Sequence, residues 1–188
     1  MTYDQETRLK MYTNWYPILD IIENKNKKNI LEFGCGVGTR KLCEEFKKVY
    51  SFETAKDEEW FLKTKTDLKH FDNWDVYFKS FSYYGIDYSD AQLLSSNGST
   101  RDIKPLEKYL NELDNFVNLS DIDVAFVDQG FHNRGETVNY LFSKGVPFIF
   151  AHDYNCAPDL YGWNLIDANK FCYKQRGSVV STVGSWSL

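Results

Sequence analysis

NILEFGCGVGTRKLCEEFKKVYSFE, residues 29–53, is the stretch that decides the fold of this chain. It begins with a short apolar run, Asn29 to Phe33, which is typical of a buried parallel strand. Gly34, Gly36 and Gly38 follow at alternate positions. They predict a tight turn, because glycine adopts backbone conformations that other residues avoid and lets a ligand come close to the backbone.

A helix and a second strand follow the glycine turn. Residues 39–49 carry apolar residues at helical spacing, with lysines and glutamates on the other face. Val49 to Phe52 then predicts a strand that ends at Glu53. This acid lies 19 residues beyond Gly34, close to the separation at which an acid meets a ribose in dinucleotide sites. The stretch therefore predicts the first half of a nucleotide-type cofactor site.

The spacing of the turn and its acid indicate which cofactor. The glycines follow a GxGxG pattern, and Thr39 stands where the dinucleotide pattern GxGxxG requires glycine. Glu32 would repel a pyrophosphate but attract S-adenosylmethionine (SAM), which carries a sulfonium and an ammonium. Unit charges in contact interact by about 4 kcal/mol at an effective dielectric near 20. The sign of this interaction favours SAM over a nicotinamide dinucleotide.

Two motifs carry a family resemblance. LEFGCGVGT, residues 31–39, resembles the first motif of class I SAM-dependent methyltransferases, and the acid of VYSFE, residues 49–53, resembles their second. The resemblance implies that Glu53 binds the ribose hydroxyls. It also implies that the methionine end is held by Glu32 and the turn residues Gly34, Gly36, Gly38 and Thr39. The alternative is a glycine turn that only connects a strand to a helix.

Strands and helices alternate along the rest of the chain. Helices are expected at residues 56–71, 105–117 and 136–144, strands at 75–81, 122–127 and 146–151, and a closing antiparallel pair at 171–173 and 179–183. This order predicts an α/β, Rossmann-like fold with a mostly parallel seven-stranded sheet and helices on both faces. We expect one domain over residues 1–188, in which residues 1–28 form a helical segment that packs on the sheet or caps the cofactor cleft.

Acids follow the fourth and fifth predicted strands. Because the carboxyl ends of parallel strands meet at one edge of a sheet, Asp128 and Asp153 are expected beside Glu32 and Glu53. Two carboxylates can hold a divalent cation such as Mg²⁺ or Mn²⁺, and Asn155 could add an oxygen. Such a metal would lower the pKa of an acceptor hydroxyl. Alternatively, Asp128 caps a turn and Asp153 caps the next segment or pairs with Arg134.

The second half of the chain also resembles O-methyltransferases. Families that methylate sugars have motifs similar to SFETAKDEEW, residues 51–60, and to the His-Asp pair after the fifth predicted strand. Metal-dependent catechol-type enzymes are similar in having an acid after both the fourth and the fifth strand. The catechol-type Asp-Asn pair and lysine base are not matched. His132 is therefore the candidate base, with a solvated loop histidine as its alternative, and His152 is expected to be a core histidine. Several aromatic residues could line an acceptor pocket or simply pack: Tyr83, Tyr84, Tyr88, Tyr154, Tyr161 and Trp163.

Composition limits the possible partners. The formal charge of −5 over 188 residues provides no general attraction for nucleic acid, and VDQG stands where amino methyltransferases of bases carry an Asp/Asn-Pro-Pro-aromatic run. The four cysteines form no metal spacing or CxxC pair and suggest a reducing compartment. Without a signal or membrane-length segment, a cytoplasmic location is expected.

The sequence thus predicts a SAM-dependent O-methyltransferase that acts on a hydroxyl of a sugar, glycan or other small molecule, with possible help from a metal. Asp128, Asp153 and His132 are its candidate catalytic residues, and Asp128, Asp153 and Asn155 are its candidate metal ligands. Three alternatives remain: a metal-independent methyltransferase with a histidine base, a non-catalytic partner subunit with a SAM-binding fold, and a nicotinamide-dependent reductase. The last is disfavoured by Glu32 and by the lack of a suitably placed Tyr-x-x-x-Lys pair.

Overall fold

The computed structural model describes residues 29–54, 58–84, 104–129, 133–154, 161–166, 172–178 and 181–187. Several sequence-based expectations lie outside these ranges: the helical segment at residues 1–28, Tyr88, the candidate base His132 and the candidate ligand Asn155.

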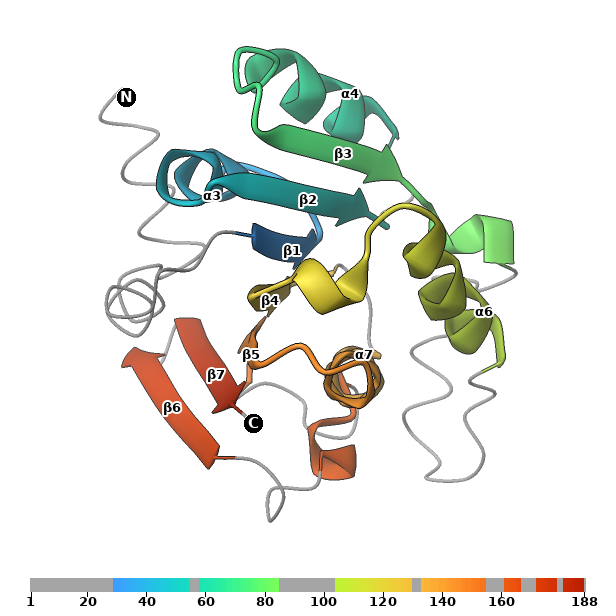
Figure 1. Cartoon of the computed structure of the whole chain (residues 1–188), viewed down its shortest axis with the longest axis vertical. Coiled ribbons are helices and arrows are strands. Elements are labelled where there is room, and N and C mark those ends of the chain that lie inside the picture. Colours follow the sequence, from blue (N-terminus) through green and yellow to red (C-terminus); the bar gives the residue numbers. More distant parts are fainter. Residues whose placement is uncertain are drawn as a thin grey trace.

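Seven strands form one sheet in the order β3-β2-β1-β4-β5-β7-β6 (Figure 1). The strands are β1 (Asn29–Phe33), β2 (Lys48–Glu53), β3 (Trp74–Phe78), β4 (Val124–Val127), β5 (Phe148–His152), β6 (Cys172–Ser178) and β7 (Ser181–Ser187). The first five pair in parallel, while β7 is antiparallel to both β5 and β6. The expected mostly parallel seven-stranded sheet with a closing antiparallel pair is confirmed.

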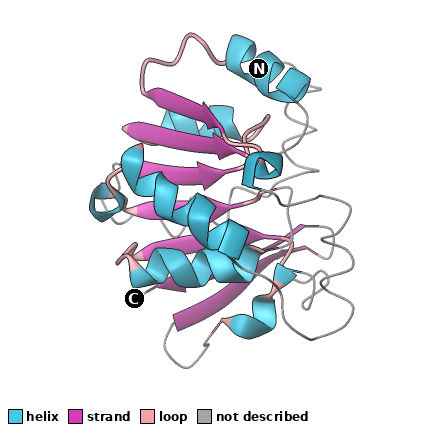
Figure 2. Ribbon diagram, turned by 90° about the vertical axis from the view of Figure 1, so that its right-hand side faces the viewer, coloured by secondary structure: helices cyan, strands magenta, loops and turns pink. Residues whose placement is uncertain are grey.

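Helices cover both faces of the sheet (Figure 2). They are α3 (Thr39–Glu45), α4 (Glu58–Asp67), α6 (Lys104–Glu112) and α7 (Arg134–Ser143). Side chains from α6 and α7 pack in one apolar cluster and those of α3 pack in another, on the opposite face. Within the described residues, no helix is long and apolar enough to span a membrane.

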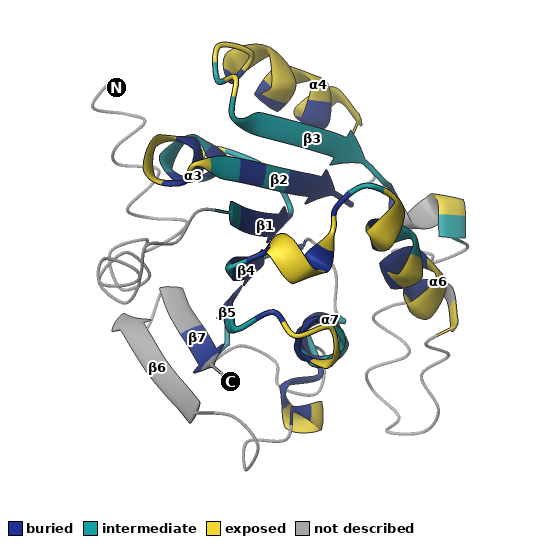
Figure 3. Ribbon diagram, viewed as in Figure 1, coloured by how far each residue is buried: buried dark blue, intermediate teal, exposed yellow. Residues whose placement is uncertain are grey.

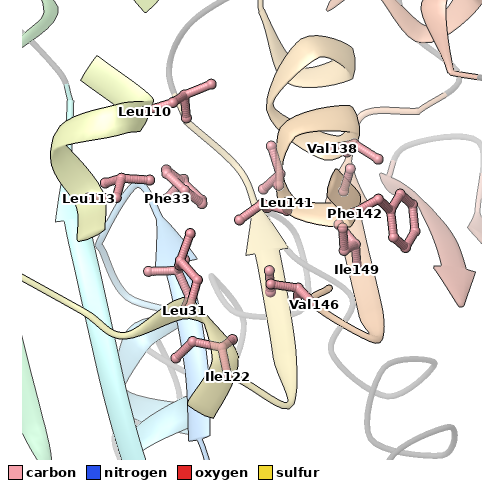
Figure 4. Packing of buried hydrophobic residues seen from close by; sticks show 14 of the residues in the cluster. Leu31, Phe33, Leu110, Leu113, Ile122, Val138, Leu141, Phe142, Val146 and Ile149 are labelled. Carbon is pink, nitrogen blue, oxygen red and sulfur yellow. The ribbon is translucent and has the colours of Figure 1, made fainter. Parts of the chain in front are cut away.

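Strand alternation explains the two apolar clusters. Leu31 and Phe33 of β1 point to the face covered by α6 and α7, whereas Ile30 points to the face covered by α3. Figure 4 shows the larger cluster, in which Leu113 lies on one side of Phe33 and Leu141 lies on the other. The central strands β1 and β4 are almost completely buried (Figure 3), as expected of parallel strands covered on both faces.

The first helix is shorter than the sequence suggests. Helical spacing predicted residues 39–49, but α3 ends at Glu45, and Phe46 adopts an extended backbone. The side-chain amide of Asn73 donates to the carbonyl oxygens of Cys43 and Phe46 at 2.9 and 2.8 Å. A distant residue therefore satisfies carbonyls that a longer helix would have satisfied itself, and the chain turns early into β2.

A candidate cofactor site and a charged cluster at one sheet edge

The carboxyl ends of β1, β2, β4 and β5 lie along one edge of the sheet, because these strands are parallel. The chain runs outward from β1 to β2 and β3 on one side and returns to β4 on the other. β1 and β4 therefore flank the point at which the strand order reverses, which is where open α/β sheets bind ligands. Glu32, Glu53, Asp128 and Asp153 all lie at this edge, as expected from the sequence.

The glycine turn packs directly against the end of β4. Gly34 has a φ of +89°, and a Cβ at this position would lie 2.6 Å from the carbonyl oxygen of Asp128. The backbone amide of Gly34 donates to the carbonyl of Phe52 at 2.8 Å. Only glycine fits here, both for its left-handed backbone and for the close approach of a neighbouring chain segment. The turn therefore joins the two halves of the site.

Glu32 lies beneath this turn and not at its surface. Its side chain is 2% exposed and accepts hydrogen bonds from the hydroxyls of Ser51 at 2.6 Å and Thr39 at 2.9 Å. The Thr39 hydroxyl in turn accepts a hydrogen bond from the amide of Gly36 at 2.9 Å. Burial raises the pKa of Glu32 to about 8, and the two hydroxyls only partly offset this effect. Glu32 thus holds the shape of the turn through Thr39.

Glu53 approaches the turn from the end of β2. One carboxylate oxygen accepts a hydrogen bond from the amide of Cys35 at 3.0 Å, and the other accepts one from the amide of Thr54 at 2.8 Å. The hydroxyl oxygen of Thr54 is buried without a hydrogen-bond partner. A carboxylate and an unsatisfied hydroxyl beside a glycine turn suit a ligand that carries hydroxyl groups.

Trp60 on α4 also contacts the turn. Its indole nitrogen donates to the carbonyl of Cys35 at 3.0 Å, and a Cβ at Gly36 would lie 3.2 Å from its ring. The side chain remains 41% exposed. Sequence reasoning placed Trp60 within a motif, SFETAKDEEW, without giving it a part in the cofactor site. The motif includes Trp60, but the contact of Trp60 with the glycine turn depends on the orientation of α4, which cannot be predicted from the motif.

Asp128, His152 and Asp153 form the second part of the site. Nδ1 of His152 lies 3.3 Å from Oδ1 of Asp128 and 3.2 Å from Oδ1 of Asp153. Burial alone would lower the pKa of His152, but these two carboxylates outweigh burial and raise it to about 9. The imidazole is therefore protonated at neutral pH. His152 is buried, as expected, but it forms part of the charged cluster instead of the apolar core.

Arg134 is the residue of this cluster that sequence reasoning mentioned only as an alternative partner of Asp153. Its side chain is 5% exposed, and Nη1 lies 3.2 Å from Oδ2 of Asp153 and 3.4 Å from Oδ1 of Asp128. Nη1 also donates to the carbonyl of His152 at 2.8 Å, and Nε donates to the carbonyl of Gln129 at 3.1 Å. The guanidinium therefore binds the ends of β4 and β5 together. The signal available in the sequence was an arginine between a strand-end acid, Asp128, and a predicted helix.

Aromatic residues gather on one side of Arg134. Its guanidinium carbon lies 4.4 Å from the ring centroid of Tyr161. Tyr154 and Tyr161 each pack against Trp163, at centroid distances of 5.4 and 5.8 Å. Tyr84 does not share this place, since its hydroxyl donates to Glu112 on α6 at 2.6 Å. Three of the six predicted aromatic residues thus meet at the charged cluster.

A divalent metal at this cluster would compete with a cation of the protein itself. Ligand atoms of Asp128, His152 and Asp153 lie within 4.8 Å of one another, close enough to share one ion. However, the carboxylates already face the guanidinium of Arg134, which stays protonated, whereas His152 would lose its proton on binding a metal. Like unit charges 4 Å apart repel by about 4 kcal/mol at an effective dielectric of 20, and a divalent ion beside the guanidinium by about twice that, so a metal here would have to displace Arg134.

Comparisons with known proteins agree on the fold. No protein-family model and no curated protein matches the sequence. Among solved structures, the chain is similar to a protein assigned as a caffeoyl-CoA O-methyltransferase from Staphylococcus aureus, with a TM-score of 0.59 and 13% identity over 98% of this chain and 89% of that one.

Two further structures have the same fold, and their names give different acceptor atoms, oxygen for one and nitrogen for the other. An O-methyltransferase from Bacillus cereus, solved in complex with S-adenosylhomocysteine (SAH), matches with a TM-score of 0.54 and 12% identity over 100% of this chain and 82% of that one. The N-methyltransferase NodS from Bradyrhizobium japonicum matches with a TM-score of 0.55 and 12% identity over 98% and 97%. The chain therefore has the Rossmann-like fold of class I SAM-dependent methyltransferases, as its sequence motifs predicted.

Proposed function

We propose that this chain is a SAM-dependent O-methyltransferase that methylates a hydroxyl group of a small molecule or glycan. The observation that carries the proposal is the glycine turn between β1 and α3, which Glu32 shapes through Thr39 and which Glu53 contacts through Cys35. This turn, two carboxylates and the neighbouring end of β4 form the surroundings that a cationic nucleoside cofactor requires.

Each residue at the turn has a defined part in binding SAM. Glu53 accepts hydrogen bonds from the ribose hydroxyls, in addition to those from Cys35 and Thr54. The buried hydroxyl of Thr54, which lacks a partner, is a second polar contact at the same strand end. Glu32 keeps the turn in place from below, and a bound cation would favour the ionised form of its carboxyl, which burial disfavours in the empty protein. The absence of side chains at Gly34 and Gly36 leaves the backbone open to the methionine end of the cofactor.

The acceptor is proposed to lie against the charged cluster. When bound, SAM supplies a methyl group on a sulfonium, and the acceptor oxygen must lose its proton as it takes this group. The side chain of Asp128 is 26% exposed and lies next to the turn, so it accepts the hydrogen bond of the acceptor hydroxyl and orients it. His132, outside the described residues, remains the candidate base from the sequence.

A sugar or glycan is the preferred acceptor in this proposal. It is supported by the sequence pattern SFETAKDEEW and by Tyr154 and Tyr161, which are half-buried aromatic residues beside the cluster, of the kind that contact sugars. A small phenolic acceptor would use the same aromatic residues. The choice between them requires a direct assay.

Calorimetric titration with SAM, SAH and NADH tests the proposal. We expect SAM and SAH to bind with a stoichiometry of one and NADH not to bind. Glu53→Gln should weaken both nucleoside ligands about tenfold, because a charge-assisted hydrogen bond contributes about 1.5 kcal/mol or more. Arg40→Gln, on the exposed side of α3, is the matched control and should leave both affinities unchanged.

Acceptor identity is tested separately. Nucleotide sugars, free glycans and catechols are incubated with methyl-labelled SAM, and the products are analysed by mass spectrometry. A protein that binds neither SAM nor SAH would overturn the proposed function. Binding of SAM combined with methylation of an amine instead of a hydroxyl would overturn the O-methyltransferase assignment alone.

A further inference from the structure

The charged cluster contains a buried cation in the place where a metal would bind two strand-end carboxylates. The side chain of Arg134 is 5% exposed, and its Nη1 contacts a carboxylate oxygen on each side, from Asp128 and from Asp153. A buried guanidinium is costly unless its donors are paired, and here Nε donates to the carbonyl of Gln129 while Nη1 also donates to the carbonyl of His152. Arg134 is thus a built part of the cluster and not a surface side chain that reaches in.

The backbone at Asp153 is held so that its carboxylate meets this cation. Asp153 has a φ of 58°, the only positive value outside glycine among the described residues. Such a conformation persists only where surrounding contacts hold it. Two hydrogen bonds hold the backbone on either side of Asp153. Nη1 of Arg134 donates to the carbonyl of His152, and the indole of Trp163 donates to the carbonyl of Asp153 at 3.3 Å.

The position of α7 fixes the direction from which Arg134 enters. Gly135, the next residue, lies so close to Gly162 that a Cβ on it would be 1.9 Å from the carbonyl oxygen of Gly162. The first turn of α7 is therefore pressed against the segment that carries Tyr161 and Trp163. The side chain of Arg134 cannot withdraw from the carboxylates without breaking this contact or losing the ring of Tyr161 beneath it.

We propose that Arg134 is a positioning residue that replaces a divalent metal at the acceptor site, so that the protein holds Asp128 and Asp153 together without a metal ion. The catalytic part of this inference rests on the proposed function, whereas its test by metal binding does not. The guanidinium supplies the positive charge and fixes both carboxylates, and the acceptor hydroxyl loses its proton to a base without a metal to lower its pKa.

Manganese binding to the full chain tests the proposal. Free Mn²⁺ is followed by electron paramagnetic resonance, and thermal melting is recorded with and without 1 mM Mn²⁺. The wild type is expected to bind no Mn²⁺ at this cluster and to melt at the same temperature in both conditions. Arg134→Met removes the cation but keeps an apolar stem, and it should gain one Mn²⁺ site and a metal-dependent rise in melting temperature.

Two controls separate this gain from general damage. Arg134→Lys keeps a positive charge near the carboxylates and should bind no Mn²⁺, like the wild type. Adding Asp153→Asn to Arg134→Met should abolish the new site, because one of the two carboxylates is lost. A variant that only loosens the structure would not acquire a site that depends on Asp153.

Stoichiometric Mn²⁺ binding by the wild type that Asp153→Asn removes would overturn the proposal, and this measurement needs no arginine variant to fold. A failure of Arg134→Met to gain Mn²⁺ while remaining folded would also overturn it. The calorimetric titration with SAM is independent of these results. A protein that binds SAM but no metal supports both proposals, and one that binds neither supports the replacement of the metal while overturning the methyltransferase.

Discussion

Glu32 is a carboxyl group that the fold buries without a cationic partner among its described contacts. Two hydroxyls bind it, and the indole of Trp74 donates to the same Ser51 hydroxyl that donates to Glu32. Its other electrostatic neighbours are the carboxylates of Asp128 and Glu53, which also raise its pKa. A residue in such surroundings weakens the empty protein and becomes favourable once a cation binds nearby, as expected of a cofactor site.

Replacing Glu32 with glutamine is expected to change how stability depends on pH. The pKa of Glu32 rises from 4.5 to about 8 on folding, so its contribution to stability is complete below about pH 4.5 and is lost as the pH rises through about 8. Glutamine does not ionise. Glu32→Gln should therefore melt at a higher temperature than the wild type at pH 9, by several degrees, with a smaller difference at pH 6. Each pKa unit corresponds to about 1.4 kcal/mol.

Melting curves between pH 5 and pH 9.5 measure this effect. Ser51→Ala provides a companion variant, because it removes a hydrogen bond that lowers the pKa of Glu32 and should extend the alkaline loss of stability to higher pH. Parallel pH profiles for wild type and Glu32→Gln would show that the buried carboxyl is not the titrating group. The same variant should lose affinity for SAM most clearly above about pH 8, where the carboxyl of the wild type is ionised and glutamine carries no charge.

The contact between a turn and a strand end decides whether the two halves of the site meet. The glycine turn reaches β4 only because Gly34 has no side chain, and a methyl group there would press on the carbonyl of Asp128. Gly145, after α7, has a similar φ of +83° but nothing within 4 Å of its would-be Cβ. Gly34 and Gly145 thus have similar left-handed backbones but differ in what surrounds their Cβ positions.

Replacing Gly34 and Gly145 with alanine should distinguish the cost of a left-handed backbone from the cost of a close contact at the added Cβ. Gly145→Ala is expected to lower the free energy of unfolding by about 1 kcal/mol, the cost of a left-handed alanine. Gly34→Ala adds a close contact with backbone and should cost about 3 kcal/mol or more. Urea denaturation of both variants checks the difference. Equal losses for the two variants would mean that the turn gives way easily and that its contact with β4 does not hold the site together.

At the level of elements, the sequence predicted which helices and strands form better than where they end. Helical spacing correctly placed α3 after the glycine turn, yet α3 stops four residues before the predicted end because Asn73 satisfies its last carbonyls. The closing strands β6 and β7 are each longer than expected, since their pairing with one another and with β5 extends the ladder. Such boundaries depend on partners that are distant in sequence.

At the level of the whole molecule, the order of strands and helices was predictable because the glycine turn and the alternating pattern are local. The edge that collects Glu32, Glu53, Asp128 and Asp153 followed from one rule about parallel strands. The role of Arg134 did not follow, because its contacts depend on how closely α7 approaches the segment at Gly162. The sequence therefore predicted where the acids lie but not the guanidinium that binds them, and the possible metal at Asp128 and Asp153 stays a prediction.

The negative charge of the site should make the affinities for SAM and SAH respond differently to salt. The chain has a formal charge of −5, and Glu53 and Asp128 lie at the edge where the cofactor is proposed to bind. SAM carries one more positive charge than SAH, at the sulfonium, and otherwise makes the same contacts. Salt shortens the Debye length from about 10 Å at 0.1 M to about 3 Å at 1 M. Affinity for SAM should therefore fall more steeply with salt than affinity for SAH.

Calorimetric titrations of both ligands between 0.05 and 1 M NaCl measure this difference. We expect the ratio of the Kd of SAM to that of SAH to rise by roughly a factor of two to five, because exposed charges are screened fully and buried ones only in part. Glu53→Gln removes a carboxylate from the edge and should flatten the change. If the two Kd values rise in parallel, the carboxylates at this edge do not act on the sulfonium, and Glu32 and Glu53 shape the turn without selecting the charge of the ligand.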